Sequence, residues 1–174
     1  MKKSEKMKSL IASICILGLV GMVVGVAVQG ADTAPVSATV TPKLITVSVS
    51  PGTVAYGILG TNTTTSTIPA ELDQTQTATD GSNVDVALNI KSSDAVGGTP
   101  WELAAAAGEN AFVHKFKGGD AADWTQLPVD NTTYATLDAK PAAGSVAFDL
   151  QITTPTITTD YVLKTITVTV QVTE

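Results

Sequence analysis

Few side chains in this sequence are of the types that catalyse reactions. The single histidine, His114, lies between Phe112 and Phe116 in the stretch AFVHKF, and no nucleophile motif such as G-x-S-x-G accompanies it. One histidine cannot form a histidine-rich zinc site, and the only cysteine, Cys15, lies close to the N-terminus. The acidic residues form many pairs, but context singles none out for glycoside hydrolysis. We therefore predict no enzymatic activity and no cofactor.

Oxygen ligands for a cation are concentrated in the stretch GGDAADW. Asp120 and Asp123 lie there in a glycine-rich loop and could bind calcium, with Asp130 as a third ligand. The stretch lacks the dense alternating oxygens of a calcium-binding loop. A solvated hairpin loop explains the same residues, and we predict no metal site.

Two tryptophans, Trp101 and Trp124, could form an aromatic platform for a sugar ring. In a β-sandwich a tryptophan more often packs into the core or between the sheets. Trp101-Glu102-Leu103 also resembles one of the two W-x-L motifs of a family of cell-wall-binding sandwich domains, although the second motif is missing here. Binding to cell-wall glycan is therefore the alternative function.

Two N-x-T sequons, at Asn62 and Asn131, lie in turn-like contexts. An exported chain could be glycosylated at either asparagine if its host has the machinery. Such triplets also arise by chance in a threonine-rich chain. Both asparagines remain candidate modification sites.

The N-terminal residues have the layout of an export signal. Four lysines precede an uncharged apolar run, residues 10–28, and small residues follow it. We expect residues 1–31 to be a signal peptide. Candidate cleavage sites follow Ala27, Gly30 and Ala31. The run approaches the roughly 20 residues that span a bilayer, so an uncleaved hydrophobic helix that anchors the chain is the alternative. Either way residues 32–174 are exported, and we expect an extracellular or cell-surface location.

The exported part would be acidic and free of cysteine. Six lysines and no arginine stand against fifteen carboxylates in residues 32–174, a net charge of 6 − 15 = −9. Such a surface repels phosphate backbones and anionic lipid, so we predict no nucleic-acid partner and membrane contact only through residues 10–28 if they are retained. Without disulfides, the domain must be held by its core and its hydrogen bonds.

Apolar residues recur with a period of two along most of residues 32–174. Three stretches show it most clearly, at 84–90, 146–152 and 166–172, with threonine common on the opposite face. Turn signals separate such stretches at short intervals. The pattern predicts a single all-β domain, an antiparallel immunoglobulin-like or jelly-roll-type sandwich of seven to nine strands. The side chains expected to face inward are Val84, Val86, Leu88, Ile90, Val146, Phe148, Leu150, Ile152, Ile166, Val168 and Val170.

The stretch SVSPGTVAYGIL, residues 48–59, resembles the opening of immunoglobulin-like surface domains of bacteria and archaea, which begin S-P-x-x-[VI]-x-[FY]-G. Those domains continue with an N-V-x-V-x-L-x-I strand, matched here by residues 83–90. The resemblance extends loosely from Val36 to the end of the chain and implies a small secreted sandwich with a structural role. It implies no active site.

A candidate exchangeable strand lies at residues 34–41, ahead of a predicted strand at 44–49. Val36, Ala38 and Val40 alternate at even positions, whereas the apolar residues of the next strand are odd, so one straight strand cannot bury both sets. Pro42 separates the two and allows a break. The layout resembles donor-strand subunits of pili and matrix fibres, which implies a homopolymer formed by strand exchange. The alternative is an ordinary first strand of a monomer.

Overall fold

The computed structural model describes residues 36–139 and 144–174, and the predicted signal helix lies outside them. The chain divides into two compact units, residues 1–41 and 42–174. In the described end of the first unit, residues 36–41 form no strand, and Val36 and Val40 are 90% and 89% exposed. The second unit contains all the described strands.

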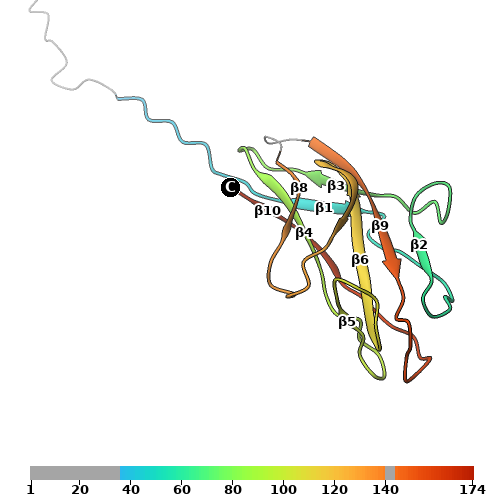
Figure 1. The fold of residues 1–174 in the computed structure, drawn as a ribbon. Helices are drawn as coiled ribbons and strands as arrows, with labels where there is room; N and C mark the ends of the chain where they lie inside the picture. Colours follow the sequence, from blue (N-terminus) through green and yellow to red (C-terminus); the bar gives the residue numbers. More distant parts are fainter. Residues whose placement is uncertain (1–35, 140–143) are drawn as a thin grey trace, which may run out of the picture. The chain divides into compact units, whose positions relative to one another are not determined.

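The second unit is all-β, and its described residues form ten strands in two sheets (Figure 1). The larger sheet contains β1 (Val47–Ser50), β2 (Thr64–Ser66), β3 (Gln76–Asp80), β5 (Glu102–Leu103), β6 (Ala111–Gly118), β7 (Ala121–Gln126) and β9 (Gly144–Thr153). The smaller sheet contains β4 (Ala87–Ser92), β8 (Ala135–Asp138) and β10 (Val168–Thr173). No helix among the described residues is long and apolar enough to cross a bilayer.

The predicted all-β class is confirmed, but two details differ from the sequence analysis. The described residues form ten strands rather than seven to nine, because β2 and β5 have only three and two residues and are too short to show an alternating pattern. In addition, β5 pairs parallel with β6, so the larger sheet is mixed rather than purely antiparallel.

The two longest strands, β9 and β6, form the centre of the larger sheet and pair antiparallel with each other. The other edge of each of these two strands pairs with two shorter strands in succession. The first half of β9 pairs with β3 and its end with β2, while β6 pairs with β5 and β7. β1 follows β3 at the edge of the sheet.

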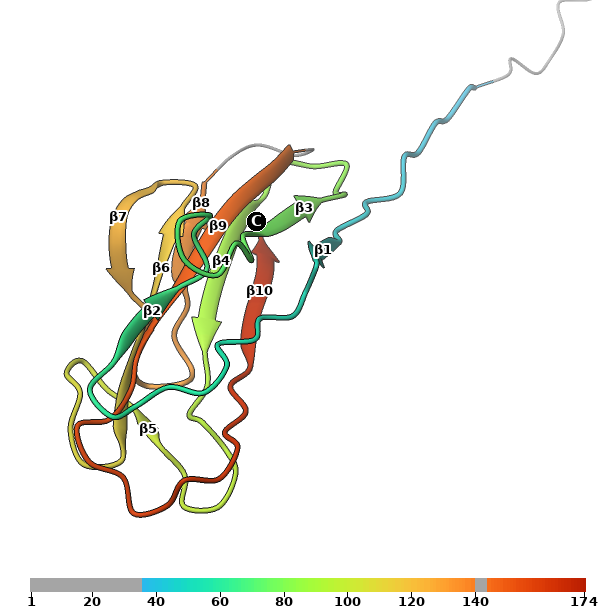
Figure 2. The same cartoon turned by 90° about the vertical axis from the view of Figure 1, so that its right-hand side faces the viewer.

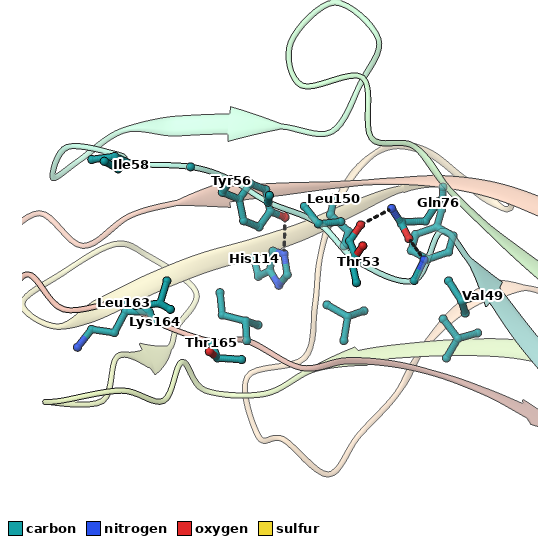
Figure 3. A pocket seen from close by; sticks show the side chains of 18 residues that line it. Val49, Thr53, Tyr56, Ile58, Gln76, His114, Leu150, Leu163, Lys164 and Thr165 are labelled. Atoms are coloured by element: carbon teal, nitrogen blue, oxygen red, sulfur yellow. Dashed lines mark hydrogen bonds between the residues drawn. The ribbon is translucent and has the colours of Figure 1, made fainter.

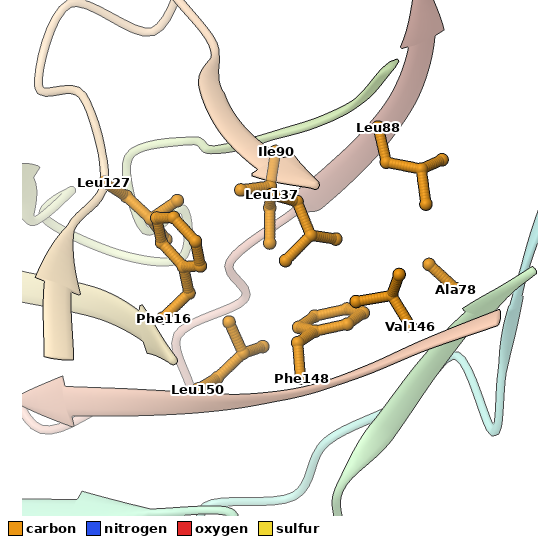
Figure 4. Packing of buried hydrophobic residues seen from close by; sticks show 9 residues of the cluster. All are labelled: Ala78, Leu88, Ile90, Phe116, Leu127, Leu137, Val146, Phe148 and Leu150. Carbon is orange, nitrogen blue, oxygen red and sulfur yellow. The ribbon is translucent and has the colours of Figure 1, made fainter. Parts of the chain in front are cut away.

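The main core lies between the two sheets (Figure 4). The predicted register of β9 is confirmed, since its even residues from Val146 to Ile152 are buried and Asp149 and Gln151 are not. Val86, Leu88 and Ile90 are buried as predicted. The remaining residues expected to be buried are only half-buried: Val84, Ile166, Val168 and Val170.

In the smaller sheet β10 is an edge strand, because it pairs only with β4 among the described strands. Figure 2 shows β10 between β4 and β1, and β1 contacts β10 without pairing with it. The two sheets therefore meet along β1 and β10 without a shared hydrogen-bond ladder.

Candidate binding groove

An apolar groove of about 720 Å³ opens between two extended segments of the second unit (Figure 3). One wall is the segment Gly52–Ile58, and the other is residues 163–170. The floor includes Phe148 and Leu150 from β9, two side chains that are otherwise buried in the core. The groove therefore reaches down to the hydrophobic core, whose Phe148 and Leu150 stay 2% and 4% exposed beneath the two walls.

The first wall belongs to no strand and is held by two glutamines rather than by a backbone ladder. Gln74 Oε1 accepts from the Ala55 amide at 2.7 Å, and Gln74 Nε2 donates to the Ala55 carbonyl at 3.1 Å. Gln76 Oε1 accepts from the Gly52 amide at 2.9 Å, and its Nε2 donates to the Thr53 carbonyl at 3.2 Å. These side chains take the place of a neighbouring strand's backbone groups, and this wall therefore stands a side chain's length away from β3.

The second wall has a free backbone edge. Thr165 exchanges two hydrogen bonds with Val96, of 2.8 and 2.9 Å, on the side of β4. Backbone groups of successive residues in an antiparallel strand point alternately to the two edges. Those of Ile166, Val168 and Val170 therefore point to the edge of β10 that no described strand pairs. The same three side chains line the groove, which explains why they are only half-buried.

The only histidine lies in the groove floor, held by hydrogen bonds on both ring nitrogens. Tyr56 Oη is 3.0 Å from Nε2 of His114, and Ser92 Oγ is 2.8 Å from its Nδ1. Burial lowers the pKa of His114 to about 4 and raises the pKa of Tyr56. A neutral imidazole with both nitrogens bonded connects the first wall to the two sheets, and it is a structural element of the groove.

A second hollow of about 380 Å³ continues the groove beyond Tyr56 and Ile166. Trp101 lines it, and the indole Nε1 donates to Thr158 Oγ1 at 3.0 Å. The Lys164 ammonium lies 5.5 Å from the centre of the Trp101 ring. Trp101 is half-buried and packs against the smaller core cluster, while Trp124 is half-buried on β7.

The three carboxylates considered for calcium have separate places: Asp130 caps its own turn, Asp120 bonds a backbone amide of a distant segment, and Asp123 is exposed on β7. Asp130 Oδ1 accepts from the Thr132 and Thr133 amides at 3.0 and 2.7 Å, and the hydrogen bonds from Thr133 lower the pKa of Asp130 to about 2. Asp120 Oδ2 accepts from the Ala139 amide at 2.9 Å. Among the described residues no three histidine, cysteine or acidic side chains are grouped as a metal site.

The two sequons differ in their surroundings. Asn62 is exposed in a turn with a φ of 53°. Asn131 is half-buried, its Nδ2 donates to Asp94 Oδ2 at 3.0 Å, and its Oδ1 is buried without a hydrogen-bond partner among the described residues. Only Asn62 presents its side-chain amide to solvent.

The two glutamines that hold the first wall, Gln74 and Gln76, were not predicted from the sequence as contact residues. A signal was present, because Gln76 stands two positions before Ala78 in β3 and both are buried. A polar residue at a core-facing position of a strand needs hydrogen-bond partners, so it marks a specific tertiary contact. Which backbone it contacts cannot be read from the chain.

In comparisons with known proteins, no family model, no curated protein and no solved structure matches this chain. The fold and the groove together define an all-β protein of two sheets with an open edge over its core.

Proposed function

We propose that this protein is an exported structural subunit that assembles into a filament, pilus or matrix at the cell surface by β-strand addition between copies. The supporting observation is the groove, which combines an apolar floor with the free edge of β10. Apolar surface open to water is unfavourable, and an unpaired edge accepts another strand. One added strand covers the floor and pairs the edge at the same time.

The proposed occupant is residues 34–41 of a neighbouring copy, which we call the donor segment. Val36, Ala38 and Val40 place three apolar side chains on one face of an extended chain. The donor segment and the second wall, residues 163–170, are each eight residues long. The described part of the donor segment forms no strand of its own, as expected of a segment that gains its partner in an assembly.

An immunoglobulin-like surface domain is the class that we propose for the second unit. The motif that suggested it, residues 48–59, forms the end of β1 and the first wall, where Val54 and Tyr56 pack against the core. This role requires neither catalysis nor a cofactor. Binding to cell-wall glycan has less support, because the ring and the indole N–H of Trp101 are both engaged within the protein.

The test uses the alternation of the donor segment. We would express the full chain in a host that exports it and compare Val36→Asp/Val40→Asp with Ser37→Asp/Thr39→Asp. Both variants add the same charge to the same segment, but only the first places it on the face that enters the apolar groove. We expect filaments from the wild type and from the second variant, and monomers from the first, by electron microscopy and sedimentation.

Deletion of residues 31–41 is the companion experiment and should also abolish assembly. Polymers formed by the deleted protein or by Val36→Asp/Val40→Asp would refute the donor segment. A wild-type protein that stays monomeric on its native surface and at millimolar concentration would refute the proposed function as a whole.

A further inference from the structure

The groove has two unlike ends, which bear on the direction of an inserted strand. At one end β1 contacts β10, and Lys43 Nζ forms an ion pair with the Glu174 carboxylate. The chain ahead of β1 is also fastened there, since the Asn83 amide donates to the Leu44 carbonyl at 3.1 Å. We call this the closed end, because the domain's own chain and a charged pair lie across it.

At the opposite end the groove opens into the second hollow, among exposed apolar side chains. Four of them line that hollow, with exposed fractions of 103%, 87%, 50% and 86%: Ile58, Tyr161, Val162 and Leu163. We call these four residues the mouth patch. Exposed apolar residues that cluster at the mouth of a groove are typical of a contact surface for another protein.

The mouth patch is held in place by polar contacts beneath it. Lys164 Nζ donates to Asp160 Oδ1 at 2.6 Å and to the Thr99 carbonyl at 2.7 Å, and it also reaches the Gly97 carbonyl. The Lys164 side chain is only 6% exposed. The loop that carries the patch is therefore ordered before any partner binds, which lowers the entropic cost of docking.

We infer that the donor segment of a neighbouring copy lies antiparallel to β10 and leaves the groove at its open end, over the mouth patch. This inference rests on the proposed function and specifies its geometry. The residues placed opposite each other are Val36 and Val170, Ala38 and Val168, and Val40 and Ile166.

This register agrees with the alternation of both strands. Residues that lie opposite each other in neighbouring strands have their side chains on the same face of the sheet. The apolar side chains of the donor segment therefore face the groove floor, on the same side as the three wall residues opposite them. The backbone groups of those wall residues are the ones that point to the free edge. In this register Pro42 comes opposite Lys164, near the end of the second wall, where the groove opens into the second hollow. Proline has no N–H to donate, so pairing ends where the donor must leave the groove.

The residues that follow the donor segment fit the open end and not the closed end. Leu44 and Ile45 are 55% and 39% exposed and belong to the body of the incoming copy. In the antiparallel arrangement they arrive beside the mouth patch, so apolar surface meets apolar surface. In the parallel arrangement they would arrive at the charged pair of Lys43 and Glu174, and apolar groups would desolvate an ion pair.

Two pairs of cysteines separate the two directions. In the antiparallel register Thr41 is opposite Thr165, whereas in the corresponding parallel register, which puts Val36 opposite Ile166, it is opposite Gln171. Thr165 and Gln171 are both exposed, and their separation of six positions corresponds to roughly 20 Å of strand, far beyond the reach of one disulfide. The full-length variants would be Thr41→Cys/Thr165→Cys and Thr41→Cys/Gln171→Cys, each with Cys15→Ser, exported and mildly oxidised.

We expect a ladder of disulfide-linked polymers from the Thr165 variant on a non-reducing gel and uncrosslinked subunits from the Gln171 variant. A ladder from the Gln171 variant, or filaments that crosslink in neither, would overturn the inferred direction while strand addition itself could stand. A disulfide within one monomer, or no filaments from the wild type, would overturn both the direction and the proposed function.

The mouth patch has its own test, with a matched control. Leu163→Asp places a charge in the patch, and Val129→Asp places one at another exposed apolar residue, outside both hollows. We expect Leu163→Asp to raise the concentration needed for half-maximal assembly at least tenfold and Val129→Asp to leave it within twofold. Equal effects of the two variants would show that the mouth patch is not a contact between copies.

Discussion

The hydroxyl of Tyr56 lies 3.0 Å from Nε2 of His114, and this contact joins the first wall of the groove to strand β6. Tyr56 belongs to the stretch that resembles immunoglobulin-like surface domains, and His114 belongs to the aromatic stretch AFVHKF. Nothing in the sequence indicates that these two residues are in contact. Their contact makes the only histidine a structural group, buried and neutral at physiological pH.

Burial of His114 predicts that stability depends on pH between about 6.5 and 4. The pKa of His114 is about 4 in the folded protein, against 6.5 ordinarily. Between these two pH values the unfolded chain therefore binds a proton at this histidine and the folded protein does not. The contribution of His114 to the free energy of unfolding is therefore fully present above pH 6.5. It is lost as the pH falls towards 4, which lowers the free energy of unfolding by about 3 kcal/mol in all. Urea titrations between pH 7 and 4.5 measure the slope before most carboxylates protonate.

The control for this prediction is His114→Gln, which keeps a hydrogen-bonding side chain but cannot titrate. Its free energy of unfolding should be lower than that of the wild type at pH 7 but nearly flat down to pH 4.5. Equal slopes in the two proteins would show that His114 is not the group responsible.

Hydrogen exchange should separate the roles of the two glutamines that hold the first wall. Gln76→Met removes the acceptor of the Gly52 amide and leaves that of Ala55, while Gln74→Met does the reverse. In each variant the freed amide should exchange roughly tenfold faster, and the other should stay protected. If both amides lose protection together in both variants, the wall opens as one unit and the separate bonds are not what holds it.

The extent to which the sequence predicts this fold follows from the length of each pattern. β9 repeats its apolar residues over ten positions, so its register could be read directly, whereas β2 and β5 are too short to carry a period. The half-burial of Ile166, Val168 and Val170 could not be predicted, because it depends on how far the first wall, residues 52–58, lies from them. That segment is fixed by Gln74 and Gln76, about twenty residues away in sequence.

For residues 36–40 the sequence predicts a strand that the described structure does not contain. Their pattern is that of a strand, but a strand requires a neighbour with which to pair, and the described structure gives them none. The donor segment therefore remains a prediction from pattern, length and the shape of the groove.

Phe148→Ala should be strongly destabilising. The ring is 2% exposed and lies in the main core, so its loss leaves a cavity and should cost about 3 to 5 kcal/mol. Ser145→Ala, on the exposed face of the same strand, removes one solvent-exposed hydrogen bond to Thr79 Oγ1 and should cost no more than about 1 kcal/mol. Chemical denaturation of the three proteins provides the comparison, and a loss below about 1 kcal/mol for Phe148→Ala would contradict the packing of β9.

Glycosylation, where the host carries it out, should occur at Asn62 and not at Asn131. The sugar is attached to the side-chain amide nitrogen, which is exposed at Asn62, whereas at Asn131 it donates to Asp94 at 3.0 Å beside a buried oxygen. Modifying Asn131 would replace one of its two N–H hydrogens and force a polar sugar against a half-buried turn beside Asp94. The intact mass of the exported protein should lose its sugar increment in Asn62→Gln and keep it in Asn131→Gln. An increment that disappears only in Asn131→Gln would show that the turn opens before the protein folds around it.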